Sequence, residues 1–155
     1  MMTISDADKR DETRSPHHLW SYLNGEFITA DSALLPVTTQ AFNYGTAVFE
    51  GIRGYAHHAD NTVNVFRLDD HINRLIQSAL LLLIDDLPEP QALKALTLAL
   101  LKKNDVEDDC YIRPIAYKRH LLPGTGFGVK LSGVSSGLSV NSLNMRAYIK
   151  QGGVK

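Results

Sequence analysis

The hydrophobic and polar positions of the chain change their period twice. Between residues 19 and 68, apolar and polar residues alternate in short runs, which is typical of strands half-buried in a sheet. From 69 to 103 the apolar residues recur every three or four positions, which is typical of amphipathic helices. Alternation returns at 110. Strands enclosing two consecutive helices predict an α+β fold, an antiparallel sheet packed with two or more helices.

The first strands are expected as a hairpin at 19–30. Asn24 and Gly25 readily adopt positive φ angles, and this pair favours a tight two-residue turn. Residues 31–42 contain Pro36 and several polar residues, so they predict a connector.

Longer alternating segments follow on either side of the helices. Residues 47–55 predict a strand, and 63–68 predict a second strand that pairs back onto it. Residues 110–120 predict another. Pro114 lies within that segment and indicates an edge strand or a bulge, because proline has no backbone N–H to donate to a neighbour.

Two helices are expected between these strands. The first begins at Asp69, and its apolar stripe comprises Ile72, Leu75, Ile76, Ala79, Leu80 and Leu83. The second follows Pro90, which suits the first turn of a helix. Its stripe comprises Leu93, Leu96, Thr97, Leu100 and Leu101.

The remaining segments complete the domain organisation. Residues 1–18 are polar and charged, without an apolar run that could act as a signal peptide, and predict a flexible N-terminal arm. Residues 19–155 predict one domain, long enough to bury a sizeable core. Within it, the Ser/Gly-rich stretch 132–137 predicts a loop and 144–150 a final short strand.

Composition then narrows the class of protein. The net charge of −1 gives no general attraction to nucleic acid or to anionic membranes. The longest apolar block, at 79–84, is far too short to span a bilayer. The single cysteine, Cys110, excludes an internal disulfide and fits a reducing compartment. The histidine pairs at 17–18 and 57–58 lack the spacing of a zinc site. We therefore expect a cytoplasmic protein that binds no metal, nucleic acid or membrane.

Candidate chemistry lies on one face of each predicted strand. Strand alternation places on common faces Phe49, Gly51, Arg53 and Tyr55, and Tyr111, Arg113, Ile115 and Tyr117. Guanidinium groups match carboxylates and phosphates, so an anion pocket is one interpretation. The pattern by itself favours the other interpretation, a solvated sheet face with aromatic residues as cross-strand partners.

Arg74 is a third candidate. It lies opposite the apolar stripe of its predicted helix, in line with Asp70 and Leu81. The pattern favours an exposed ion pair with Asp70 one turn earlier, worth about 0.2–0.5 kcal/mol. Leu81 on the same side argues slightly against a purely solvated face.

Three motifs in order resemble a known family. "NYGTAVFEGIRGY" (43–55), "VFRLDDHINRL" (65–75) and "YIRP" (111–114) are similar to the N-terminal half of class IV pyridoxal-phosphate aminotransferases. Within that class they most resemble the branched-chain amino-acid aminotransferases. D-amino-acid aminotransferases and aminodeoxychorismate lyases share the layout but usually lack the "FEGIR…YIRP" combination.

The resemblance implies the small domain of a fold-type IV enzyme. It implies pyridoxal 5′-phosphate as cofactor, a homodimer, and amino transfer between leucine, isoleucine or valine and 2-oxoglutarate, with glutamate as the product. The site residues that it implies are Arg74 for the cofactor phosphate, and Tyr44, Phe49, Gly51, Arg53, Tyr111 and Arg113 for the substrate.

Each substrate residue has an implied role. Phe49 lines the pocket for the branched side chain, and Tyr111 helps to hold the substrate α-carboxylate. Arg53 lies near the pocket, and Arg113 recognises the distal carboxylate of glutamate. Tyr44 reaches across the dimer into the partner's pocket.

The resemblance also implies a missing part. In the family, the Schiff-base lysine and the acidic partner of the pyridine nitrogen belong to a C-terminal domain. No lysine here lies in a matching context, whether Lys9, Lys94, Lys102, Lys103, Lys118, Lys130, Lys150 or Lys155. Residues 115–126 also depart from the family's loop. We expect a small domain that is inactive alone. The alternatives are a non-catalytic truncated remnant, or a sibling activity such as D-amino-acid transamination or aminodeoxychorismate lyase.

Overall fold

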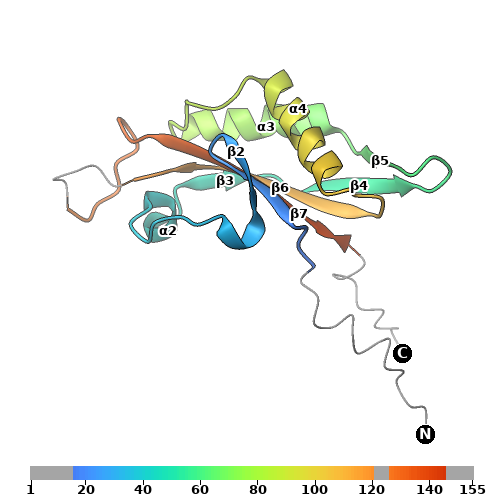
Figure 1. Ribbon diagram of the computed structural model, residues 1–155. Helices are drawn as coiled ribbons and strands as arrows, with labels where there is room; N and C mark the ends of the chain where they lie inside the picture. The colour runs from blue at the N-terminus through green and yellow to red at the C-terminus, as the bar shows by residue number, and fades with distance from the viewer. Residues whose placement is uncertain (1–15, 121–125, 146–155) are drawn as a thin grey trace, which may run out of the picture.

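A single antiparallel sheet, covered on one face by two helices, organises the chain (Figure 1). The computed structural model describes residues 16–120 and 126–145. The strands are β1 (Trp20–Leu23), β2 (Glu26–Thr29), β3 (Ala47–Phe49), β4 (Ile52–His57), β5 (Thr62–Val65), β6 (Cys110–Lys118) and β7 (Ser136–Asn144). Their order is β2-β1-β7-β6-β4-β5, with β3 also paired to β6. The predicted α+β class is confirmed.

The helices are of two kinds. The long ones are α3 (Leu68–Leu81) and α4 (Pro90–Lys103), which lie side by side on one face of the sheet. The short ones are the 3₁₀ helix η1 (Ala30–Ser32) and α2 (Gln40–Tyr44), which lie toward the other face. Both short helices fall in or beside the predicted connector, where the sequence shows no helical period long enough to be detected.

The N-terminal hairpin forms as predicted. Leu23 pairs with Glu26, so Asn24 and Gly25 are the whole turn. Their φ angles are 49° and 112°, the positive values that this two-residue connection needs.

The core lies between the helices and the sheet. The helices contribute Leu68, Ile72, Leu75, Ala79, Leu93, Leu100 and Leu101, and the strands contribute Ile52, Cys110, Ile112, Ala116, Leu138 and Val140. Two positions of the predicted stripe are corrected. Leu80, near the end of α3, and Leu83, which follows the helix and has a positive φ, are both about half exposed. Ile84 fills the core instead.

Pro114 does not mark an edge, so that expectation is wrong. β6 is a central strand that pairs with β7 along its whole length, including Pro114 opposite Val140. The Glu50 N–H donates to the Pro114 carbonyl. Pro114 has no N–H, so it cannot donate a hydrogen bond back to Glu50. At this position the facing strand is interrupted, because β3 ends at Phe49 and β4 begins at Ile52. The register is the same on both sides of this gap.

The C-terminal part of the sheet also differs from the prediction. Ser136 and Gly137, expected in a loop, begin β7, a nine-residue strand beside β6. Of the predicted strand at 144–150, only Asn144 belongs to β7, and residues 146–150 lie outside the described part.

The predicted arm also lies largely outside the described residues. Its last part runs along β7. The Asn144 N–H donates to the Pro16 carbonyl, the His18 N–H donates to the Ser142 carbonyl, and His17 pairs with Leu143. In residues 16–120 and 126–145, no helix is long and apolar enough to cross a membrane.

Candidate functional site

The sheet face turned away from α3 and α4, here called the open face, carries the candidate residues in rows across three strands. Arg53 on β4 lies opposite Tyr111 on β6, which lies opposite Leu143 on β7. In the next row, Arg113 lies opposite Asn141. The two predicted face patterns therefore meet on one surface.

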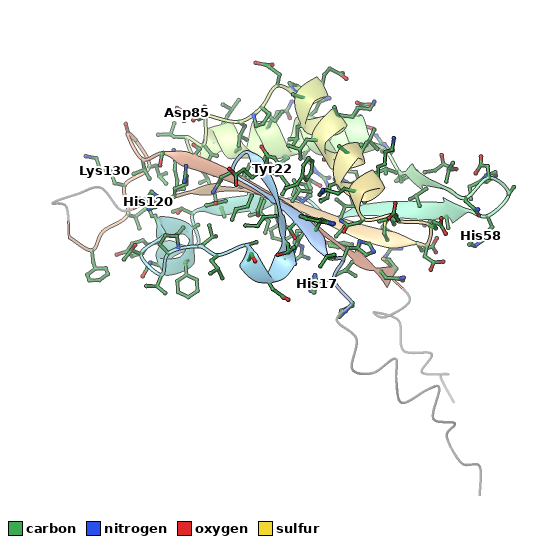
Figure 2. The ribbon with its side chains drawn as sticks, in the orientation of Figure 1. His17, Tyr22, His58, Asp85, His120 and Lys130 are labelled. Carbon is green, nitrogen blue, oxygen red and sulfur yellow. The ribbon has the colours of Figure 1, made fainter. Side chains whose placement is uncertain are left out.

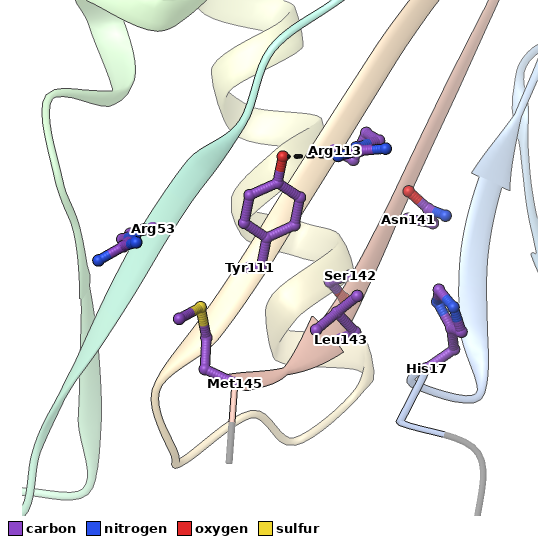
Figure 3. A pocket seen from close by; sticks show the side chains of 8 residues that line it. All are labelled: His17, Arg53, Tyr111, Arg113, Asn141, Ser142, Leu143 and Met145. Atoms are coloured by element: carbon purple, nitrogen blue, oxygen red, sulfur yellow. Dashed lines mark hydrogen bonds between the residues drawn. The ribbon is translucent and has the colours of Figure 1, made fainter. Parts of the chain in front are cut away.

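A cavity of about 380 Å³ opens on this face (Figure 3). Its lining residues are His17, Arg53, Tyr111, Arg113, Asn141, Ser142, Leu143 and Met145. Two of them are arginines and none is acidic. The electrostatic character of the cavity therefore suits an anion.

Arg113 is held in a defined orientation. Its Nη2 donates to the Tyr111 hydroxyl at 2.9 Å. The guanidinium carbon is 4.8 Å from the centre of the Phe49 ring and 5.2 Å from that of Tyr111, within the range of cation–π contacts. Because the Tyr111 oxygen accepts from Arg113, its own O–H can still donate to a carboxylate oxygen.

Gly51 provides the space for this arrangement. A side chain at this position would collide with the hydroxyl end of Tyr111. The sequence indicates a gap between Phe49 and Arg53 where a ligand could approach. In the structure, the Tyr111 side chain fills that gap.

Arg74 belongs to α3, which covers the sheet face opposite the open face. Its predicted pair with Asp70 does not form. Its Nε donates to Glu50 Oε1 at 2.6 Å and its Nη2 to Oε2 at 2.5 Å. Asp70 pairs instead with Arg67, at 2.7 Å. The hydrogen bonds from Arg74 lower the pKa of the Glu50 carboxyl below its ordinary value, and Glu50 in turn raises the pKa of Arg74.

The structure therefore brings together part of the predicted set. Arg53, Tyr111 and Arg113 line the cavity, Phe49 stacks on Arg113, and Gly51 accommodates Tyr111. Tyr44, the last residue of α2, and Arg74 do not line it. Their roles, which involve a partner subunit and a cofactor, remain predictions.

Sequence reasoning missed the other wall of the cavity, which comprises His17, Asn141, Ser142, Leu143 and Met145. His17 lies on the side of the sheet away from α3 and α4 (Figure 2). A signal was present in the period-two alternation of residues 138–143, where Leu138, Val140 and Ser142 are buried.

Comparisons with known proteins agree on one family. Residues 47–151 match the family model of the class IV aminotransferases. A probable branched-chain-amino-acid aminotransferase of Synechocystis sp. is 34% identical over 135 residues, which are 86% of this chain and 42% of that protein.

Solved structures give the same result. The branched-chain aminotransferase of Thermoproteus uzoniensis with norvaline matches with a TM-score of 0.72 and 28% identity, over 82% of this chain and 41% of that one. The branched-chain amino acid aminotransferase of Thermobaculum terrenum, in its PLP-bound holo-form, matches with a TM-score of 0.72 and 29% identity, over 84% of this chain and 41% of that one.

The chain is an α+β domain whose sheet carries a cavity lined by two arginines and no acidic residue. The family model matches most of its length. The chain belongs to the class IV aminotransferases. It spans about two fifths of the length of the relatives named above.

Proposed function

We propose that this chain supplies the substrate pocket and the cofactor phosphate contact of a cytoplasmic branched-chain amino-acid aminotransferase. The reaction would transfer an amino group between leucine, isoleucine or valine and 2-oxoglutarate. The buried free thiol of Cys110 suits a reducing compartment.

The observation that carries the proposal is the Tyr111–Arg113 pair in the cavity. A hydroxyl with a proton to donate and a fixed guanidinium beside it can bind one or two carboxylates. Phe49 and Leu143 add apolar surface close to these polar groups. A branched side chain and the second carboxylate of glutamate could use the same site in turn.

Arg74 is the residue that would hold the phosphate of pyridoxal 5′-phosphate. Its side chain is 65% exposed, and Glu50 occupies only the Nε–Nη2 edge of the guanidinium. The edge formed by Nη1 and Nη2 is the side available to an anion, so the residue fits a phosphate. When bound, the cofactor supplies the electron sink that amino transfer requires.

Tyr111 and Arg113 would orient the substrate by its carboxylate groups, and Arg53 would add positive charge at the end of the cavity. Phe49 would exclude water from the substrate side chain. Orientation of the reacting groups is the contribution expected of this part of the protein.

The proposal includes a homodimer. Apolar side chains are exposed before and within α2, with Leu34, Val37 and Phe42 each more than three-quarters exposed. A patch of this kind is typical of an interface. Tyr44 lies at the end of the same helix, so an interface there would bring it toward a partner subunit.

An amino-transfer assay tests the proposal. It uses protein expressed from the gene together with any coding sequence that follows codon 155. L-leucine and 2-oxoglutarate should yield glutamate, whereas D-alanine or aminodeoxychorismate should not react. Reaction with either of these and not with leucine would replace the assignment by the sibling activity. A folded, cofactor-loaded dimer without leucine-dependent glutamate formation would refute it.

A further inference from the structure

The Glu50 carboxylate is buried between two side chains of α3. Its side chain is 6% exposed, and it accepts hydrogen bonds from Arg74 at 2.6 and 2.5 Å. The His71 Nδ1 lies 2.9 Å from the same carboxylate. Glu50 thus forms one hydrogen-bonded cluster with two residues of α3 that lie 21 and 24 positions later in the sequence.

This cluster fixes the direction of the Arg74 guanidinium. A free arginine side chain samples many rotamers, and ordering it costs conformational entropy. The two parallel hydrogen bonds to Glu50 hold the Nε–Nη2 edge, although the side chain is largely exposed. The other edge therefore keeps one orientation.

Glu50 also connects Arg74 to the substrate wall. It lies between Phe49 and Gly51, at the gap between β3 and β4, and its N–H donates to the Pro114 carbonyl. Its neighbours face the open side of the sheet, whereas its own side chain faces α3. The same short backbone segment thus supports the cavity on one face and Arg74 on the other.

We propose that Glu50 is a positioning residue that holds Arg74 ready to bind a phosphate group. This inference rests on the proposed function, in which Arg74 binds the cofactor phosphate. His71, on the same helix as Arg74, contacts the Glu50 carboxylate and helps to hold it in place.

Charge alone predicts the opposite effect of Glu50. A carboxylate within 3 Å of a phosphate-binding guanidinium reduces the attraction of the site for anions, so its removal should tighten anion binding. If Glu50 acts by positioning, its removal should weaken anion binding. The sign of the change therefore distinguishes the two.

The experiment measures the affinity of the 155-residue chain for pyridoxamine 5′-phosphate and for pyridoxamine by calorimetry. The two compounds differ only in the phosphate, so the difference in their affinities measures its contribution. Neither has an aldehyde, so neither reacts covalently with lysines. The variants are Arg74→Ala, Glu50→Gln and Asp70→Asn. The last removes one negative charge from an exposed ion pair on the same helix and is the matched control.

We expect Arg74→Ala to abolish the preference for the phosphorylated compound. Glu50→Gln should weaken phosphate-dependent binding by about three- to tenfold, because Arg74 must then be ordered on binding. Asp70→Asn should leave the affinity unchanged or slightly tighter. Where Glu50→Gln does not fold, as judged by its amide NMR spectrum, Glu50→Asp is measured instead. It keeps the charge, shortens the side chain by one methylene, and should also weaken binding.

Two results separate this inference from the function on which it rests. Binding by Glu50→Gln or Glu50→Asp as tight as in the wild type, with binding lost in Arg74→Ala, overturns the positioning role and leaves the phosphate contact intact. An equal preference in the wild type and Arg74→Ala, or none in either, overturns the phosphate contact and the positioning role with it.

Discussion

The Tyr111 hydroxyl packs against Gly51, in the space that any larger residue would need for its β-carbon. The glycine lies in the gap between β3 and β4, and its small size lets Tyr111 reach Arg113. The motif predicts Gly51 as a substrate residue. In the structure, Gly51 leaves room for the Tyr111 side chain.

Replacing Gly51 by alanine should therefore displace Tyr111. We expect Gly51→Ala to weaken binding of 4-methylpentanoate, a carboxylate with a branched chain, by about tenfold, the scale of one hydrogen bond to a charged group. Titration followed by NMR measures this. In a Tyr111→Phe background the same substitution should cost much less, because the hydroxyl that collides is gone. Gly128→Ala is the control, since its β-carbon would meet open space.

Arg113 should discriminate between substrates with one and two carboxylates. We expect Arg113→Gln to weaken binding of glutarate by at least tenfold and binding of 4-methylpentanoate by much less, because only glutarate has a distal carboxylate for the guanidinium. Competition between the two compounds measures the ratio. An equal loss for both would show that Arg113 acts only by holding Tyr111.

The Glu50–Arg74 pair should make stability depend on pH. Hydrogen bonds from Arg74 lower the pKa of folded Glu50 below its ordinary value of 4.5. The pair therefore stabilises the fold above pH 4.5, and this contribution is lost as the pH falls through the lower folded pKa. In urea titrations, the difference in free energy of unfolding between wild type and Glu50→Gln should be largest near neutral pH and shrink in acid. A difference independent of pH would contradict the ionised pair.

Lys118 should be important for stability although it lies outside the cavity. It is 1% exposed, and its ammonium group donates to the carbonyls of Leu83 and Val134. Lys118→Ala would leave these carbonyls unpaired beside a void, at a cost of about 2–4 kcal/mol in the free energy of unfolding. Urea denaturation measures the cost. The exposed Lys130, replaced by alanine, should change stability by less than about 0.5 kcal/mol.

Strand periodicity was sufficient to predict which residues of segment 49–53 face the open side of the sheet. Phe49, Gly51 and Arg53 are exposed and Glu50 and Ile52 are buried, as a period of two requires. The same signal in β7 is weaker, because the polar Ser142 stands at a buried position and Asn141 has low strand propensity, and no element was predicted at 138–143. The cavity residues on β7 were missed for this reason.

Long-range partners could not be read from the chain. Local spacing favours Asp70 as the partner of Arg74, whereas the actual partner is Glu50, brought close by packing of α3 on β3. Pro114 misled in another way. Its missing N–H is tolerated inside the sheet because the facing strand is interrupted at that position, and this depends on the register of two distant segments.

The central claim is that the open face of the sheet binds an amino-acid carboxylate. Its most direct test is an NMR titration of the isotope-labelled chain with 4-methylpentanoate, with Tyr111→Phe as the matched variant. We predict saturable shifts that centre on Arg53, Tyr111, Arg113 and Asn141, and an affinity reduced about tenfold in the variant. Shifts confined to other surfaces, or equal affinity in the variant, would contradict the claim.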